Sequence, residues 1–201
     1  MEHAKLKRIN DILSVFVVGL GLYIALIPAL PAIQLWWTQR GGVNIPYSGE
    51  LANASVNGNK KDKPIPSDNR LVIPGIDVNQ PIKEGNSISV IDNEGVWRRP
   101  NSSSAPDKGN MVLAGHRFTY ANPYGSFYHL DKLKIDDKLA IYWQGKEYVY
   151  KVKETKVVSA SSVDIEKSTT DQQLTLYTCT PIWSAKDRLV IIAVPFEEIN
   201  Q

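Results

Sequence analysis

Hydrophobic residues in this chain form one long uncharged run near the start and several short runs in the second half. The long run covers residues 12–33 and contains no charged side chain. As an α-helix with a rise of about 1.5 Å per residue it would be roughly 33 Å long, enough to cross the hydrocarbon core of a bilayer. Basic residues at 5–8 precede the run and two tryptophans at 36–37 follow it. This distribution indicates a membrane-spanning segment whose N-terminal side lies in the cytoplasm.

Two other interpretations of the run are a cleaved signal peptide and a buried helix of a soluble core. A signal peptide has a shorter apolar core and an Ala-x-Ala-like cleavage site, a spacing that residues 29–32 lack. A buried core helix is usually shorter than this uncharged run. Pro28 and Pro31 are expected to kink or end the helix in its outer third. We therefore predict a cytoplasmic N-terminus over residues 1–11 and an uncleaved transmembrane signal anchor over 12–38.

The composition changes after the anchor. Residues 39–64 are rich in glycine, asparagine and proline, and their few apolar residues show no period. Such a composition is typical of a flexible linker. Residues 65–197 are the size of one ordinary domain. The sequence thus predicts an extracellular linker over residues 39–64 followed by one extracellular domain over residues 65–197.

A hairpin is the clearest element of that domain. Its strands are expected at residues 138–143 and 146–154, joined by Gln144 and Gly145. In the second strand, Tyr148, Tyr150 and Val152 alternate with the residues at 149, 151 and 153, which is the period of a β-strand. A polar residue followed by glycine is typical of a two-residue hairpin turn.

Further short apolar runs predict the remaining strands. They lie at residues 71–73, 76–78, 95–97, 111–115, 174–179 and 188–194. A turn is expected at residues 79–81 and a helical turn at 127–133. Many short strands with tight turns predict an all-β fold, either a closed barrel or a sandwich. We favour the barrel because the residues with catalytic potential all lie at strand ends.

Charge and cysteine content narrow the function classes. The net charge is only +2, too small to indicate a nucleic acid as partner. The chain has a single cysteine, Cys179, so the exported domain cannot form an internal disulfide. Such a cysteine is either an intermolecular link or a free thiol.

Three side chains could converge at one rim of the predicted barrel. Cys179 ends one strand, His116 follows another, and Arg188 opens the last. Each also has a purely structural interpretation. Cys179 could be a small buried residue, His116 a hydrogen-bonded surface histidine, and Arg188 part of a surface ion pair. Together they supply a nucleophile, an acid/base group and a cation for an oxyanion, which suits nucleophilic acyl transfer.

The other candidates are less well placed. His3 lies on the predicted cytoplasmic side, and His129 has apolar neighbours typical of a packing residue. The arginines at 98, 99 and 117 are expected farther from the thiol. No two of the Cys and His residues have the spacing of metal ligands, so we expect neither metal nor cofactor.

At these residues the chain resembles the sortases, cysteine transpeptidases of the bacterial cell surface. Thr-Leu-Tyr-Thr-Cys at 175–179 matches the family's Thr-Leu-x-Thr-Cys signature, and Ala-Gly-His-Arg at 114–117 matches its histidine motif. Arg188 matches the arginine after the following loop. The similarity covers about residues 73–195. It implies an eight-stranded sortase-like β-barrel, so the predicted fold is all-β, with short helical turns, behind the one N-terminal transmembrane helix that the apolar run predicts.

The resemblance also implies a reaction. Cys179 would cleave an LPxTG-like sorting signal of an exported protein between Thr and Gly, forming a thioester. His116 would protonate the departing amine, and Arg188 would stabilise the oxyanion. The acyl group would pass to an amine of a cell-wall precursor or a pilin lysine. Thr178 and Trp183 are expected to contact the substrate, although packing is an equal alternative for the tryptophan.

The subclass and two other functions stay open at this point. The linker lacks the aspartate–proline–aromatic lid of many pilin-polymerising sortases, and the loop at 180–187 is compact. This favours a housekeeping, class E-like enzyme or a lid-less class C-like one. The alternatives are a catalytically silent surface barrel that binds wall polymer or exported proteins, and a thiol peptidase that releases its product to water.

Overall fold

The computed structural model describes residues 2–40, 43–45, 47, 49–51, 58–60, 64–119 and 125–196. They belong to two compact units, Met1–Arg40 and Gly41–Gln201. Each unit has its own architecture: the first is helical and the second is built mainly of strands.

The N-terminal unit consists of α1 (Glu2–Leu26), the 3-10 turn η1 (Ile27–Ala29) and α2 (Leu30–Arg40). Pro28 is the second residue of η1, and α1 ends at Leu26, two residues before it. Proline lacks the N–H that would continue the α-helical ladder, so the sequence correctly predicts an interruption here.

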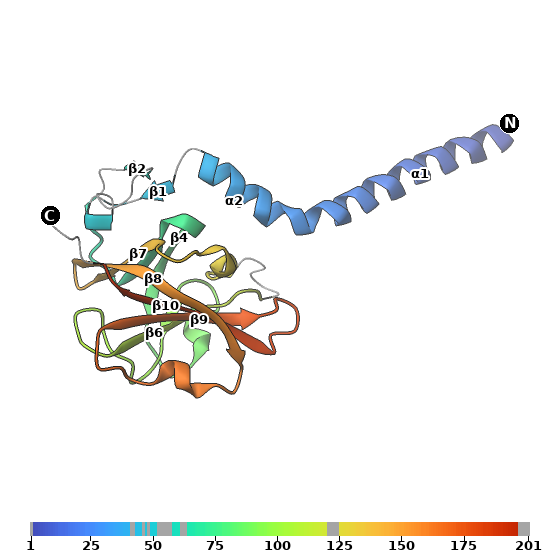
Figure 1. Ribbon diagram of the computed structural model, residues 1–201. Helices are drawn as coiled ribbons and strands as arrows, with labels where there is room; N and C mark the ends of the chain where they lie inside the picture. Colours follow the sequence, from blue (N-terminus) through green and yellow to red (C-terminus); the bar gives the residue numbers. More distant parts are fainter. Residues whose placement is uncertain are drawn as a thin grey trace. The chain divides into compact units, whose positions relative to one another are not determined.

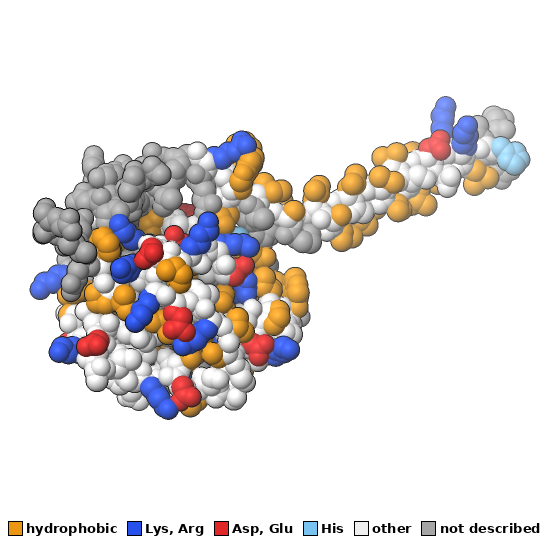
Figure 2. Space-filling model, viewed as in Figure 1, with side chains coloured by type: hydrophobic (Ala, Val, Ile, Leu, Met, Phe, Trp, Pro, Cys, Tyr) orange, Lys and Arg blue, Asp and Glu red, His pale blue; other side chains and the backbone are white. Residues whose placement is uncertain are grey.

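One helical segment among the described residues is long and apolar enough to cross a membrane by length and composition. It is Lys5–Leu26, and none of its surface is buried within the protein. Figure 2 shows hydrophobic side chains along the length of α1 and basic ones near its start. The predicted anchor at 12–38 therefore comprises the second half of α1, η1 and most of α2.

Eight strands close into a barrel within the described part of the second unit (Figure 1), which confirms the predicted fold class. They are β3 (Arg70–Ile73), β4 (Val78–Lys83), β5 (Val96–Arg98), β6 (Asn110–Ala114), β7 (Lys138–Trp143), β8 (Lys146–Ser159), β9 (Gln173–Thr180) and β10 (Asp187–Pro195). Their order around the barrel is β10-β8-β7-β3-β4-β5-β6-β9. The pairs β4–β5 and β6–β9 are parallel and the others antiparallel.

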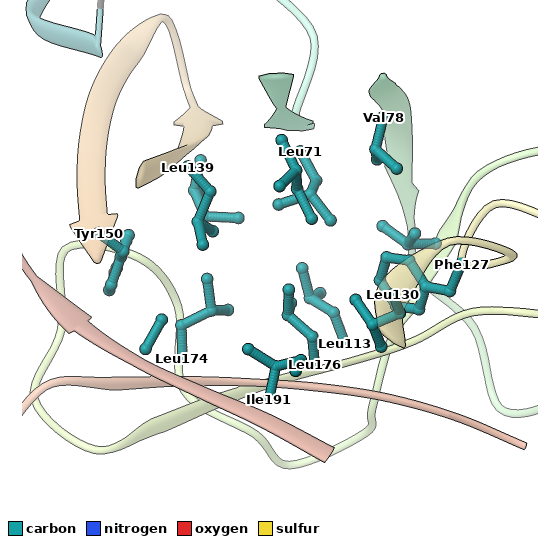
Figure 3. Close-up of a cluster of buried hydrophobic side chains, with 14 of the residues drawn as sticks. Leu71, Val78, Leu113, Phe127, Leu130, Leu139, Tyr150, Leu174, Leu176 and Ile191 are labelled. Carbon is teal, nitrogen blue, oxygen red and sulfur yellow. The ribbon is translucent and has the colours of Figure 1, made fainter. Parts of the chain in front are cut away.

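Short 3-10 helices connect some of the strands. They are η2 (Pro74–Ile76), η3 (Ile88–Ile91), η4 (Leu130–Lys132) and η5 (Val163–Glu166). The helical turn predicted at 127–133 contains η4, and Phe127, Leu130 and Leu133 are all buried. These side chains close one part of the interior, as Figure 3 shows for the first two.

Strand alternation fills the inside of the barrel. Leu139 of β7, Leu176 of β9 and Ile191 of β10 point into one buried cluster (Figure 3). The Tyr150 hydroxyl at its edge donates to the Ala105 carbonyl at 3.2 Å, and burial raises the pKa of Tyr150 to about 12. Every second residue of these strands therefore lies on the outer side.

One turn lies elsewhere than the sequence predicts. The chain reverses through η2 and Asp77, which has a left-handed φ of 55°. Residues 79–81, predicted as a turn, belong to β4. The Ile82 N–H donates to the Asn69 carbonyl at 2.8 Å, so the N–H that Pro81 lacks would point away from β3. Pairing of β4 with β5 begins only at Ile82, and the proline therefore interrupts no ladder.

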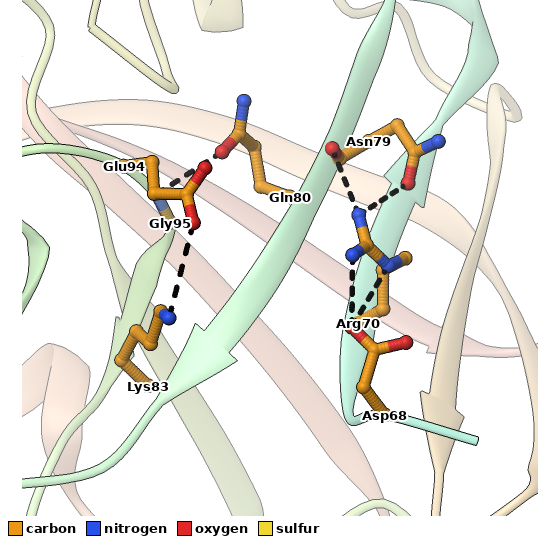
Figure 4. A network of polar contacts seen from close by, with 7 residues as sticks. All are labelled: Asp68, Arg70, Asn79, Gln80, Lys83, Glu94 and Gly95. Atoms are coloured by element: carbon orange, nitrogen blue, oxygen red, sulfur yellow. Dashed lines mark hydrogen bonds and ion pairs between the residues drawn. The ribbon is translucent and has the colours of Figure 1, made fainter. Parts of the chain in front are cut away.

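Side chains also join the first strands of the barrel (Figure 4). The Arg70 guanidinium donates to the Asp68 carboxylate at 2.8 Å and to the Asn79 side-chain oxygen at 3.0 Å. The Gln80 side-chain oxygen accepts from the Gly95 N–H at 3.0 Å. Together these bonds tie β3 to β4, and β4 to the start of β5.

Part of the predicted linker packs on the barrel. β1 (Val43–Ile45) and β2 (Gly58–Lys60) form a parallel two-stranded sheet. Leu51 is fully buried, and the ring of Tyr47 meets that of Tyr142 edge-on with 5.1 Å between centroids. The predicted boundary between linker and domain stays a prediction, although these residues belong to the barrel unit.

The surface that receives them is a second buried cluster, which we call the outer patch. Its barrel members lie on the outer side of β3, β7 and β8 and are Val72, Ala140, Tyr142 and Val149. Leu51 completes the cluster, with Tyr47 and Phe196 packed against it.

Candidate active site

Cys179 and Arg188 face each other on neighbouring strands. β9 and β10 are antiparallel, and their register makes Cys179 the direct partner of Arg188. Residues directly opposite in such a pair lie about 4.5–5.5 Å apart at Cα and share one face. Because Leu176 and Ile191 occupy the interior, the alternation places Cys179 and Arg188 on the outer side.

His116 comes to the same end of the barrel. β6 lies parallel to β9, and its last residue, Ala114, pairs with Tyr177. The Gly115 N–H extends this pairing by donating to the Tyr177 carbonyl at 3.2 Å. Two positions beyond the pair come His116 on one segment and Cys179 on the other. The three residues predicted from sequence are thus carried by adjacent segments at one rim.

The contacts of these side chains define the resting site. Arg188 Nη1 donates to the carbonyls of Ala185 and Asp187 at 2.9 and 3.0 Å. His116 has a side chain 23% exposed, and its Nε2 lies 3.6 Å from Asp92 Oδ1. Nε2 is buried without a hydrogen-bond partner in the described part of the chain. The thiol of Cys179 is free and partly exposed.

Tyr177 adjoins the thiol on the outer side of β9. Its hydroxyl donates to Glu166 Oε1 at 2.8 Å, and the same oxygen accepts from Arg99 Nε at 2.8 Å. Arg99 in turn lies over the Trp97 ring, 4.4 Å from its centroid. Burial, followed by the bond to Glu166, raises the pKa of Tyr177 above the ordinary tyrosine value. This group holds η5 against the strand that carries the thiol.

Of the two expected substrate contacts, Thr178 is a buried residue of β9. It is 2% exposed, and its hydroxyl donates to the Gly115 carbonyl at 2.7 Å. Odd and even residues of β9 face opposite sides, so Thr178 faces inward where Cys179 faces outward. The Thr178 hydroxyl thus joins β9 to the segment that follows β6, and its contact with substrate stays a prediction. Trp183 is 80% exposed, and its ring meets that of Phe118 with 4.7 Å between centroids.

Arg117, which we expected to lie farther from the thiol than Arg188, directly follows His116. Its guanidinium donates to the hydroxyl of Thr180, the residue after Cys179, at 2.9 Å. Its position directly after His116 is the one feature of the sequence that indicates a place near the site. Its burial depends on Thr180 and Asp131, residues that do not adjoin it in the sequence. His129, expected to pack, stacks edge-on with Tyr128, and burial lowers the pKa of its imidazole.

The comparison with protein families matches this architecture. The family model described as "Sortase domain" matches residues 71–196, which include the whole barrel except the first residue of β3. The chain belongs to the sortase family. Sortases are cysteine transpeptidases of the cell surface, and this membership confirms the resemblance of the sequence motifs.

Individual sortases show how far the similarity extends. Sortase SrtE1 of Streptomyces coelicolor is 32% identical over 186 residues, covering 82% of this chain and 52% of that protein. Sortase A of Listeria monocytogenes is 28% identical over 123 residues, covering 61% and 53%. The chain thus aligns with about half the length of these relatives.

Solved sortase structures share the fold. A Clostridium perfringens Sortase D5 transpeptidase superposes with a TM-score of 0.57 at 26% identity, covering 65% of this chain and 79% of that one. A lid mutant of Sortase A from Corynebacterium diphtheriae gives 0.59 at 26% identity, covering 66% and 71%. These relatives carry the names of several sortase classes, and the similarity therefore shows the family and not the class.

Proposed function

We propose that this sortase is a membrane-anchored cysteine transpeptidase that cleaves an LPxTG-like sorting signal between Thr and Gly. The observation that carries the proposal is the strand register, which sets Cys179 opposite Arg188 and brings His116 to the same rim. The apolar segment Lys5–Leu26 would hold the enzyme in the membrane, with its basic start in the cytoplasm. The barrel would then act on exported proteins that carry a C-terminal sorting signal.

Acylation begins when the Cys179 thiolate adds to the carbonyl carbon of the Thr–Gly bond. The carbonyl oxygen becomes an oxyanion in the tetrahedral intermediate, and Arg188 stabilises it. Among the described residues both contacts of the resting guanidinium use Nη1, which leaves the Nε and Nη2 donors for the substrate. The intermediate collapses as the C–N bond breaks, and His116 as imidazolium gives its proton to the departing glycine amine.

The thioester then passes its acyl group to an amine. The acceptor nitrogen adds to the thioester carbonyl while the neutral His116 removes its proton, and the Cys179 thiolate leaves. The products are a new amide and the starting thiolate–imidazolium pair, so the cycle balances. Transfer to an amine rather than water requires a positioned acceptor. Its chemistry would be that of a peptidoglycan precursor or a pilin lysine.

A quenched sorting peptide tests the proposal in the full-length protein solubilised in detergent. We expect an amidated product when an amine such as triglycine is added, identified by mass spectrometry, and none from Cys179→Ala. Cleavage to the free acid at equal rates with and without the amine would indicate a thiol peptidase. A folded protein that leaves the peptide intact would indicate a binding barrel.

A further inference from the structure

Arg117 is the only charged residue that is buried in the part of the chain the structure describes. It is 8% exposed. Burial of a charge is unfavourable unless the group is paired and hydrogen-bonded. Its Nη2 lies 2.9 Å from Asp131 Oδ1, Nη1 donates to Thr180 Oγ1 at 2.9 Å, and Nε donates to the Tyr128 carbonyl at 3.4 Å. One guanidinium therefore joins three segments of the chain.

Two of these segments carry the proposed acid/base and nucleophile. Arg117 directly follows His116, and Thr180 directly follows Cys179. The bond between Arg117 and Thr180 thus holds together the residues that come after the two reacting groups. Hydrogen bonds that involve a charged donor are stronger than neutral ones.

A second bond joins the residues that come before the reacting groups. The Thr178 hydroxyl donates to the Gly115 carbonyl at 2.7 Å, and both atoms are buried. His116 and Cys179 are therefore bracketed on both sides. A slip of one segment along the other would break both bonds.

We propose that Arg117 is a positioning residue for transpeptidation, which fixes His116 against Cys179 by holding Thr180. The inference rests on the proposed function, because it assigns a role relative to those two reacting groups. Displacement of a reacting group by about 1 Å can lower a rate by about a hundredfold. The ion pair with Asp131, whose side chain is 34% exposed, fixes the buried guanidinium of Arg117 and so keeps its bond to Thr180 in place.

The alternative role, oxyanion stabilisation, belongs to Arg188 and not to Arg117. All three kinds of guanidinium nitrogen in Arg117 already have partners in Thr180, Asp131 and Tyr128. Its side chain is 9% exposed. Arg188 bonds only to two nearby carbonyls among the described residues and lies on the outer side beside the thiol.

Thr180→Val in the full-length protein tests the inference, because it removes the hydroxyl acceptor and leaves the Arg117–Asp131 pair. We expect kcat to fall by about ten- to a hundredfold with KM within about twofold of wild type. The rate at which iodoacetamide alkylates Cys179 should also change its dependence on pH, in the direction that His116→Gln changes it. Thr180→Ser restores the acceptor and should restore both quantities.

Thr175→Val is the matched control. Thr175 lies on the same strand, and its buried hydroxyl donates to Asn110 Oδ1 at 2.8 Å, away from the rim. The control should lower the thermal midpoint without altering kcat or the alkylation profile of the folded protein. Arg117→Lys keeps a charge for Asp131 but loses the fork of donors, and its kcat should fall as Thr180→Val does.

The inference is overturned if Thr180→Val keeps the kcat and the alkylation profile of wild type. It is also overturned if Thr180→Val and Thr175→Val reduce activity alike, in proportion to the fraction unfolded. Absence of peptide transfer by wild type would refute the proposed function separately. The alkylation profiles of Thr180→Val and His116→Gln would then still decide whether Thr180 positions the histidine.

Discussion

The outer side of the barrel carries two regions. Both consist of outward-facing strand residues, but one is apolar and covered whereas the other is polar and partly exposed. The outer patch is apolar, and Leu51 and Tyr47 cover it. The strip of Tyr177, Cys179 and Arg188 on β9 and β10 is polar or chemically reactive, and each of these residues is partly exposed. The outward residues of the outer patch thus serve packing, whereas Cys179 and Arg188 in the strip serve the proposed chemistry.

A pair of tyrosines makes the comparison concrete. Tyr142 in the outer patch donates to Glu147 at 2.7 Å, and Tyr177 in the strip donates to Glu166 at 2.8 Å. The Glu147 carboxylate also accepts a hydrogen bond from the main-chain N–H of Glu50, in the segment that covers the outer patch. The Glu166 carboxylate instead forms an ion pair with Arg99. The first bond therefore fastens the cover, and the second fastens a loop beside the thiol. Because the two bonds fasten different segments, we expect stability and chemistry to respond to different substitutions.

The largest effect on the strip is expected from Gly125→Ala. A Cβ at Gly125 would collide with the main-chain carbonyl of His116, while the Gly125 N–H donates to the Arg117 carbonyl at 3.2 Å. The collision must move the histidine segment, so we expect kcat to fall by about a hundredfold. Peptide-transfer kinetics measure the loss.

Gly75→Ala is the control for this change. The nearest atom to a Cβ at Gly75 is 3.8 Å away, an ordinary contact. Its kcat should equal that of wild type. Comparable kinetics for both alanine variants would show that the His116 main chain does not need the space at Gly125.

Leu51→Ala acts on the outer patch alone. Truncation of a fully buried leucine costs about 2–5 kcal/mol of unfolding free energy. For a domain of this size each kcal/mol corresponds to roughly 2–4 °C in Tm. We expect a lower Tm in calorimetry and an unchanged kcat at 25 °C. Ile135→Ala, at a residue 54% exposed, should change Tm little. Loss of activity in folded Leu51→Ala would contradict the separation of the two regions.

Local pattern was enough to predict the hairpin and the strand ends of the site. Residues 144–145 both have positive φ, as a tight two-residue turn requires, and the flanking strands follow the predicted period. Cys179 and Arg188 could be placed at strand ends because apolar runs stop or start there. In each case the signal lies within a few residues of the element that it predicts.

Contacts between distant segments could not be predicted in this way. Leu51 is one of a few apolar residues in a stretch without period, and only the outer patch explains its burial. Arg117 looks like a surface arginine until Asp131 and Thr180 are brought beside it. The turn predicted at 79–81 was wrong because Pro81 is compatible with a strand whose other side is unpaired at that point.

The smallest effects are expected from removal of the two tyrosine hydroxyls. Burial is the main cause that raises the pKa of both Tyr142 and Tyr177 above the ordinary value of about 10. The folded protein therefore retains these protons at a pH where the unfolded chain releases them. Their contribution to stability is complete below about pH 10 and is lost as the pH rises above it. Urea unfolding of wild type should thus show a steeper loss of stability above pH 10 than either phenylalanine variant.

At neutral pH the two variants should differ by region. Each loses one hydrogen bond, about 1 kcal/mol. Tyr142→Phe should also loosen the cover of the outer patch and leave peptide transfer unchanged. In Tyr177→Phe, Glu166 keeps its pairing with Arg99, so the loss of stability should be the smaller of the two. If Tyr142→Phe slowed transfer while Tyr177→Phe lowered the unfolding free energy more, the division of roles between the two regions would be wrong.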